Sequence, residues 1–185
     1  MSYENKVKSH YLGQVAEKGL DKESTMPDHF VRKKEIETIL ETLEAMNDKG
    51  LNILEIGCGN GVLLNELHKN GYKSVTGIDF LDEFVKLSKS RDLPYDIKVG
   101  DIRSLDFGDT SFDVVIAERV IINLLDLEHQ NKAFSEIRKV TKKNGYLIMF
   151  EAFEDAWINS NNAREEFGLS KIPMASQNRW FKKGE

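Results

Sequence analysis

The sequence predicts an α/β fold, a doubly wound three-layer sandwich with helices on both faces of a parallel sheet. Three observations predict it. The buried-strand run 51–56 stops at three glycines spaced two apart. A helix-forming run, 62–67, follows at once. Strand-like runs and helical periods then alternate as far as residue 150. A strand, a glycine turn and a helix in this order present backbone N–H groups to a small ligand.

The elements follow one another with short connections. Apolar side chains recur with a helical period over residues 35–46, and Asn-Asp-Lys-Gly ends that helix. Each later strand is a short apolar run, and four βα crossovers in a row predict about five parallel strands. The expected strands are 51–56, 74–79, 95–99, 112–117 and 146–150, and the later helices are 62–70, 82–90 and 128–141.

Composition limits the kind of protein. The chain has 185 residues, of which 40% are hydrophobic, enough for one domain with a core. Its 26 basic and 31 acidic residues give a net charge of −5, which disfavours nucleic acid and anionic membranes as partners. No apolar stretch could span a membrane, and the N-terminus is too polar for a signal peptide. A single cysteine, Cys58, fits a cytoplasmic protein, and the four histidines show no metal spacing.

Acidic residues stand where ligands bind in open α/β sheets, at the carboxyl ends of the strands. Glu55 lies in the first strand, Asp79 ends the second, Asp101 follows the third and Glu118 follows the fourth. A carboxylate that ends the second strand can accept two hydrogen bonds from a ribose diol. One such residue alone is usually a solvated surface group. Four in register with the glycine turn favour a ligand with an adenosine-like part.

The glycine turn reads Leu-Glu-Ile-Gly-Cys-Gly-Asn-Gly over residues 54–61, a G-x-G-x-G spacing rather than the G-x-G-x-x-G of dinucleotide sites. Over about residues 50–150 the chain resembles class I S-adenosylmethionine (SAM) dependent methyltransferases of the small-molecule type. Their first motif is an acidic residue, an apolar residue and G-x-G-x-G. The resemblance implies the strand order 3-2-1-4-5, with SAM as cofactor and S-adenosylhomocysteine (SAH) as product.

The resemblance also implies roles for individual residues. The glycine turn would lie beneath the methionine part of SAM, Asp79 would hold the ribose hydroxyls, and Phe80 would pack on the adenine. Asp101 with its neighbour would recognise the adenine edge, and the end of the fourth strand would lie beside the methionine amino group. The implied cofactor-binding residues are Glu55, Gly57, Cys58, Gly59, Gly61, Asp79, Phe80, Asp101, Ile102, Ala117 and Glu118.

Two departures from the family pattern stand out. The turn before the fifth strand has Asn144 and Tyr146 where the family usually has a proline and a second glycine. Many small-molecule methyltransferases carry a histidine at or beside the position of Asn123, and this chain has none there. A histidine base is therefore not carried over. Cys58 is expected to be a small residue that fits the turn rather than a nucleophile.

The two ends lie outside the βα alternation. Residues 1–34 are expected to form a cap over the cofactor, with a disordered tail as the alternative, and residues 35–150 to form the SAM-binding domain. Residues 151–185 are expected to add a substrate-side or edge-covering segment with a short helix at 162–167. They lack the antiparallel hairpin of complete relatives, so the chain is either truncated or covered by a partner. Because a bare edge strand invites aggregation, the fifth strand is expected to be covered by this segment or in a homodimer.

Methyl transfer from a sulfonium mainly requires alignment and exclusion of water, with a base only where the acceptor must lose a proton. Glu118 is the candidate acid or base, and a cofactor or structural contact is its alternative. Arg119 is expected to pair with Glu118 or to bind an anionic substrate, and Arg32 to be solvent-exposed or to reach the SAM carboxylate. The substrate-side candidates are Tyr11, Arg119, Asn123 and Glu151, with His10 as a further residue to test.

Missing motifs narrow the acceptor. Ala-Glu-Arg-Val after the fourth strand is not the N/D/S-P-P-Y/F motif of DNA amino-methyltransferases, and no Pro-Cys nucleophile is present. A small molecule methylated on oxygen or nitrogen is therefore expected. A sugar-type acceptor would use donors such as Asn178 and Arg179. The alternatives are a non-catalytic SAM-binding or interaction protein, a truncated domain, and less favourably an NAD-dependent oxidoreductase.

Overall fold

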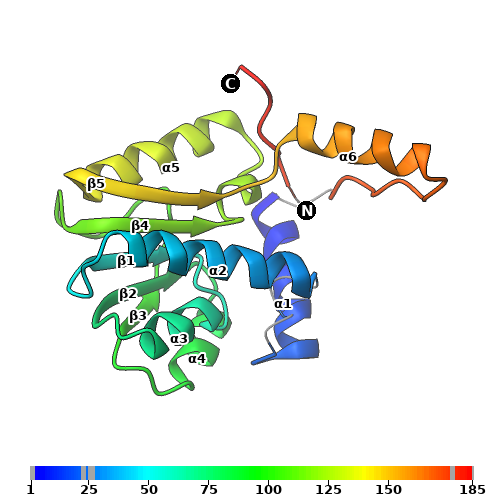
Figure 1. Cartoon of the computed structure of the whole chain (residues 1–185). Helices are drawn as coiled ribbons and strands as arrows, with labels where there is room; N and C mark the ends of the chain where they lie inside the picture. Colours follow the sequence, from blue (N-terminus) through cyan, green and yellow to red (C-terminus); the bar gives the residue numbers. More distant parts are fainter. Residues whose placement is uncertain (1–2, 22–23, 25–27, 176–177, 185) are drawn as a thin grey trace.

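The computed structural model describes residues 3–21, 24, 28–175 and 178–184. Five parallel strands form one sheet in the order β3-β2-β1-β4-β5, which confirms the expected fold and strand order (Figure 1). The first four strands start within one residue of where the sequence places them. The strands are β1 (Asn52–Ile56), β2 (Ser74–Asp79), β3 (Asp96–Val99), β4 (Phe112–Glu118) and β5 (Thr141–Phe150).

Helices cover both faces of the sheet. One core cluster joins β1, β2 and β4 to the helices α2, α3 and α4, and the second joins the opposite face of the same strands to α5. The helix α1 lies across the carboxyl ends of the strands (Figure 1). The helices are α1 (Tyr3–Lys18), α2 (His29–Ala45), α3 (Val62–Lys69), α4 (Asp82–Lys89), the 3₁₀ turn η1 (Ile121–Asn123), α5 (Leu127–Val140) and α6 (Glu154–Glu166). None of these helices is long and apolar enough to cross a membrane.

The central strand β1 explains why the sheet needs helices on both sides. Ile53 points into the first cluster, whereas Leu54 and Ile56 point into the second, and all three are nearly inaccessible to solvent. Neighbouring apolar residues that face opposite sides of the sheet, as Ile53 and Leu54 do, are typical of parallel strands buried on both faces. The sheet is therefore held by its core, and its carboxyl ends are free to carry polar side chains.

The predicted domain boundary at residues 34 and 35 is wrong, because it falls inside α2. This helix begins at His29 after the N-cap Asp28, whose carboxylate accepts hydrogen bonds from the backbone N–H groups of Phe30 and Val31. Residues 1–2, 22–23 and 25–27 of the expected cap lie outside the described residues. The remainder of the cap is therefore α1 together with the first turns of α2.

The carboxyl-terminal part also differs from expectation. β5 begins at Thr141, before residue 146, because Thr141 already pairs with Phe112 of β4; a register irregularity then separates this pair from the pairing of Val114 with Tyr146. Instead of a short helix at 162–167, α6 starts at Glu154 and projects from the body of the protein (Figure 1). Residues 176–177 and 185 of this segment lie outside the described residues.

The edge strand β5 pairs only with β4 within the described sheet. The described part of the C-terminal segment does not run along it, since Phe181 exchanges backbone hydrogen bonds with Ala152 and Glu154, beyond the strand's end. Tyr146 and Leu147 stay exposed, at 57% and 38%. Covering of this edge by the protein's own C-terminal segment is therefore a wrong prediction, and a homodimer stays a prediction.

Candidate active site

The glycine turn between β1 and α3 takes backbone angles that favour glycine. Gly57, Gly59 and Gly61 have φ values of 73°, 51° and 77°, in the left-handed region. A Cβ on Gly57 would collide with Val120, and one on Gly61 would collide with the Ser88 hydroxyl. Val120 and Ser88 therefore pack directly against the backbone of the turn.

Cys58 lies inside this turn and is buried. Burial raises the pKa of its thiol well above the ordinary value, and the nearby carboxylates of Glu55 and Asp79 raise it further. The thiolate that a nucleophilic cysteine needs is therefore disfavoured. This environment agrees with the small, turn-filling role expected from the sequence.

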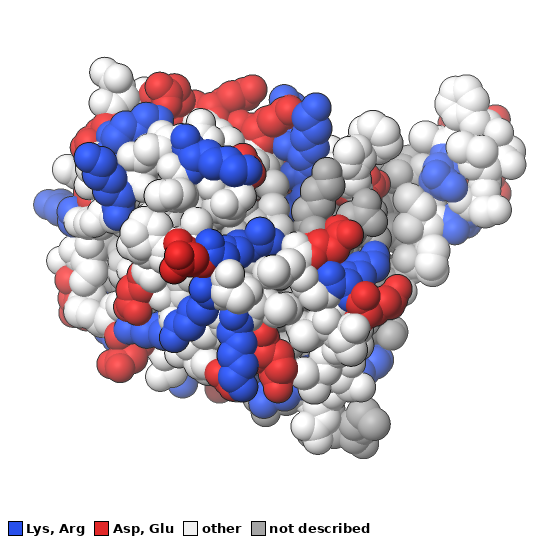
Figure 2. All heavy atoms as spheres, turned by 90° about the horizontal axis from the view of Figure 1, so that it is seen from below, with Lys and Arg blue, Asp and Glu red and all other residues white. Residues whose placement is uncertain are grey.

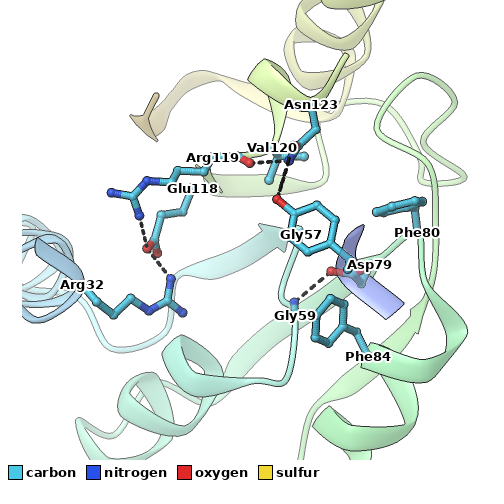
Figure 3. A pocket seen from close by; sticks show the side chains of 11 residues that line it. Arg32, Gly57, Gly59, Asp79, Phe80, Phe84, Glu118, Arg119, Val120 and Asn123 are labelled. Atoms are coloured by element: carbon cyan, nitrogen blue, oxygen red, sulfur yellow. Dashed lines mark hydrogen bonds and ion pairs between the residues drawn. The ribbon is translucent and has the colours of Figure 1, made fainter. Parts of the chain in front are cut away.

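Asp79 ends β2 and fastens the glycine turn. One carboxylate oxygen accepts a hydrogen bond from the Gly59 backbone N–H at 2.9 Å, and the other accepts one from Leu81 at 2.9 Å (Figure 3). Burial raises the pKa of Asp79 to about 6, although these backbone N–H groups pull it down. Each oxygen keeps a further lone pair, so the carboxylate can still accept hydrogen bonds from a ligand.

Two adjoining hollows open at the carboxyl ends of the strands and share Gly57, Phe80, Val120 and Asn123. The first, the charged hollow, encloses about 510 Å³ and the second, the apolar hollow, about 880 Å³, both open to solvent. The charged hollow is also lined by Tyr11, Arg32, Gly59, Asp79, Phe84, Glu118 and Arg119. The apolar hollow is also lined by Val7, Lys8, Ile56, Val99, Gly100, Asp101, Ile102, Arg103 and Leu124.

Two ion pairs close the charged hollow from the side of α2. Arg32 binds Glu118 at 2.5 Å, and Arg119 binds Glu35 while its other nitrogen lies 3.9 Å from Glu118 (Figure 3). The Arg32 and Glu118 side chains are only 12% and 5% exposed. The expected solvent exposure of Arg32 is therefore wrong, since its guanidinium is drawn in by a buried carboxylate. The ion pair expected between Arg119 and Glu118 is present, with a nitrogen–oxygen distance of 3.9 Å.

This charged group leaves polar atoms without partners. Among the described residues, this group has four buried polar atoms with no hydrogen-bond partner: Arg32 Nε, Arg119 Nη1, Glu35 Oε2 and Glu118 Oε2. Unpaired buried polar atoms are costly, and at a site they point to a ligand that satisfies them. Two donors and two acceptors suit a group that carries both a carboxylate and an ammonium.

Glu55 sits deeper, in β1, and lines neither hollow. Burial raises its pKa well above the ordinary value, the Glu118 and Asp79 charges raise it too, and Arg32 opposes them. Ala117 is likewise buried, between β1 and β5, and lines neither hollow. Direct contacts of these two residues with a cofactor stay predictions.

Tyr11 of α1 reaches across the glycine turn to Asn123. Its hydroxyl and the Asn123 amide lie 3.1 Å apart, and its ring packs edge-on against Phe80 and Phe84. Burial raises the pKa of Tyr11, with the hydrogen bond to Asn123 opposing. Asn178 donates to the same Asn123 side chain at 2.9 Å. The sequence candidates Tyr11, Asn123 and Asn178 thus form one cluster.

Other predicted residues are only partly brought together. Asp101 and Ile102 line the apolar hollow, where Arg103 holds the Asp101 carboxylate through several hydrogen bonds. Burial opposes ionisation of Asp101, but the Arg103 contacts outweigh it and lower the pKa. His10 packs on Tyr11 and lines neither hollow, and Arg179 hydrogen-bonds Gln130.

Glu151 does not face the hollows. Its carboxylate accepts hydrogen bonds from the backbone N–H groups of Val120, Ile121 and Ile122, at 3.0, 2.8 and 3.2 Å. Both oxygens are therefore engaged with the chain itself. A contact between Glu151 and substrate stays a prediction.

Sequence reasoning missed Glu35. It stands four residues before Ile39 and eight before Leu43, so on a helix it shares their buried face, and a charge there signals an unseen partner. No comparable signal in the sequence indicates that Arg32 pairs with Glu118, which lies 86 residues further along the chain. Among the described residues, no cluster of three or more potential metal ligands is found.

Comparisons with known proteins agree with this architecture. Residues 54–149, just over half of the chain, match the family model described as a methyltransferase domain. EEF1A lysine methyltransferase 2 of Danio rerio is 30% identical over 122 residues, 60% of this chain and 52% of that protein. Demethylmenaquinone methyltransferase of Renibacterium salmoninarum is 30% identical over 102 residues, 55% of this chain and 41% of that protein. The chain thus spans about half or less of the length of these curated relatives.

Solved structures give the same result. A SAM-dependent methyltransferase from Methanosarcina mazei has a TM-score of 0.59 and 26% identity, covering 68% of this chain and 64% of that one. Magnesium protoporphyrin IX methyltransferase from Synechocystis, solved with bound SAH, has a TM-score of 0.64 and 19% identity, covering 84% and 72%. At that identity the second match shows the fold alone.

Proposed function

The chain belongs to the methyltransferase-domain family, whose members use SAM, and we propose that it methylates a small-molecule acceptor on oxygen or nitrogen. The observation that carries the proposal is the pair of adjoining hollows, which share Gly57, Phe80, Val120 and Asn123. The charged hollow, with its ion pairs and Asp79, suits the zwitterionic methionine part and the ribose of SAM, and the larger hollow beside it suits the flat adenine. An NAD-dependent oxidoreductase loses its support with the family assignment.

The residues fit this cofactor. The unpartnered atoms of Arg32, Arg119 and Glu118 suit the carboxylate and ammonium of the methionine part. Asp79, in the charged hollow, suits the ribose hydroxyls. Phe80 would pack on the adenine, whose edge would meet Asp101 and the Ile102 backbone.

When bound, SAM supplies a methyl group on a positively charged sulfur, which an acceptor takes by in-line displacement. The chain's own residues then have to orient the acceptor and keep water out. Tyr11, on α1, lines the charged hollow, and the side-chain amides of Asn123 and Asn178 lie beside it. Glu118 is tied to Arg32 through one oxygen. A role as acid or base would use the same Oε2 that suits the SAM ammonium, so the two roles of Glu118 are alternatives.

A small acceptor is favoured by the surface and by the relatives. On the face in Figure 2, basic and acidic side chains are interspersed, without the single-sign stripe typical of nucleic-acid binding. Demethylmenaquinone methyltransferase is named for a small acceptor. EEF1A lysine methyltransferase 2 is named for a protein lysine, so a lysine side chain is the second acceptor to test.

The test begins with calorimetric titration of SAH into the wild type and Asp79→Ala, with Asp109→Ala, in an exposed loop, as the control. We expect binding to the wild type and the control and none to Asp79→Ala. Turnover is then assayed with small hydroxylated and amine acceptors and with a lysine peptide. Absence of SAH binding to the wild type contradicts the proposal. Binding without turnover on any acceptor supports the alternative of a non-catalytic SAM-binding protein.

A further inference from the structure

The turn that follows β4 sits tightly on the glycine turn. It carries Val120 and Asn123 into both hollows. Arg119, at its start, has a φ of 55°, in the left-handed region that is unfavourable for residues other than glycine. The Asn123 amide donates back to the Arg119 carbonyl at 2.7 Å, which closes the turn. Because Val120 fills the space beside Gly57, a small shift of this turn changes the wall that the two hollows share.

This turn begins with backbone N–H groups that its own side chains do not satisfy. Val120 is the N-cap of η1 and makes no side-chain cap hydrogen bond. Such leading N–H groups need an acceptor. The acceptor comes from the neighbouring strand, since Glu151 follows β5 directly and takes the hydrogen bonds of Val120, Ile121 and Ile122. An ionised carboxylate is an acceptor only, so it suits three donors in a row.

We propose that Glu151 is a positioning residue for methyl transfer: its ionised carboxylate holds residues 119–123 in the shape that presents Val120 and Asn123 to the bound ligands. This inference rests on the proposed function. Glu151 lines neither hollow, so it acts through the turn and not by touching cofactor or acceptor. The turn holds the strained Arg119 conformation only as long as the three hydrogen bonds persist.

The surroundings of Glu151 make this support depend on pH. Burial raises the pKa of Glu151 to about 7, against the lowering effect of the three N–H groups and of Arg119. Within the described residues, Tyr11 on α1 is a further titratable group whose charge interacts with that of Glu151. Protonation turns one carboxylate oxygen into a hydroxyl, which is a poorer acceptor for the N–H it faces. The turn therefore loses support as the pH falls through about 7.

The test is SAH affinity by calorimetry between pH 6 and 8.5 for the wild type, Glu151→Gln and Glu128→Gln. Glutamine keeps the shape of Glu151 but places an NH₂ donor against a backbone N–H. Glu128, exposed on α5, provides the same charge change as a control. At pH 8, we expect Glu151→Gln to bind about tenfold more weakly than the wild type. Its affinity stays level through pH 7, where the affinity of the wild type and the control declines.

A second measurement needs no variant. In the ligand-free wild type, the amide resonances of Val120, Ile121 and Ile122 are expected to titrate together with a midpoint near pH 7. Wild-type affinity with an unchanged pH profile in Glu151→Gln overturns this inference alone, as does the absence of that titration. A wild type that does not bind SAH overturns the proposed function, and this inference with it.

Discussion

The two hollows that meet at Gly57 are built on different principles. The charged hollow depends on Arg32 and Glu35, which come from a helix outside the βα alternation and pair with Glu118 and Arg119 at the end of β4. The apolar hollow is lined mostly by strand ends and by the turns that follow them. The charged hollow therefore depends on ion pairs between residues far apart in the sequence, and the apolar hollow depends on the shape of the strand ends.

The difference predicts unequal sensitivity to substitution, and Arg32→Met should have the largest effect. It removes a donor to the cofactor and leaves the buried Glu118 carboxylate without its main partner. We expect SAH affinity, measured by calorimetry, to fall about a hundredfold, because hydrogen bonds to charged groups contribute about 1.5–3 kcal/mol each. Thermal stability should fall as well.

Lys33→Met, one position further on the exposed side of α2, is the control and should leave affinity unchanged. Adding Glu118→Gln to Arg32→Met should recover much of the lost stability without restoring affinity. Recovery of affinity in the double variant would mean that Arg32 serves only to neutralise Glu118. The charged hollow would then not be a binding end at all.

At the apolar end, Phe80→Ala should lower SAH affinity about thirtyfold, since stacking of a base on an aromatic ring contributes about 1–3 kcal/mol. Phe30→Ala, whose ring is 79% exposed on α2, is the matched control. The measurement is the same calorimetric titration. An effect on stability equal to that on affinity would indicate that Phe80 supports the packing of Tyr11 and not the adenine.

In the charged hollow, Asp79 should make SAH affinity depend on pH, at a lower pH than Glu151 does. Burial raises its pKa to about 6, so the ionised form that accepts ribose hydroxyls is lost as the pH falls through 6. Affinity should therefore decrease by up to about tenfold from pH 6 to pH 5, the limit for loss of one ionised group. Glu151→Gln should keep this step, and a flat profile below pH 6 would exclude Asp79 from the ligand contacts.

The smallest effect is expected for Tyr11→Phe, which removes the hydroxyl that meets Asn123 and leaves the ring on Phe80 and Phe84. A single neutral hydrogen bond contributes about 0.5–1.5 kcal/mol, so SAH affinity should change about threefold. The Michaelis constant for the acceptor should change more than that for SAM. An unchanged acceptor constant would place the hydroxyl away from the acceptor.

The sequence predicts the strands and the turns after them better than it predicts the ion pairs of the charged hollow. The sheet and the turns after β1 and β2 were predictable, because strand burial leaves continuous apolar runs and the turn needs glycine. The start of α2 was obscured, since Phe30 and Val31 are exposed and interrupt the apolar period; the N-cap Asp28 was the available signal. The full length of α6 was also hard to predict, because its sequence is polar and no apolar period marks a buried face. The pairing of Arg32 with Glu118 depends on the folded chain, and no local pattern specifies it.

The ion pair between Arg32 and Glu118 has a consequence for protein engineering. Chimeras between related enzymes often keep a core and exchange the amino-terminal segment to alter specificity. In this protein, such an exchange would remove Arg32 and Glu35, leaving Glu118 and Arg119 to be matched by whatever the new segment brings. The unit that can be exchanged therefore runs from α2 to the end of β4, and a graft that starts at β1 would carry an unbalanced charge into its new host.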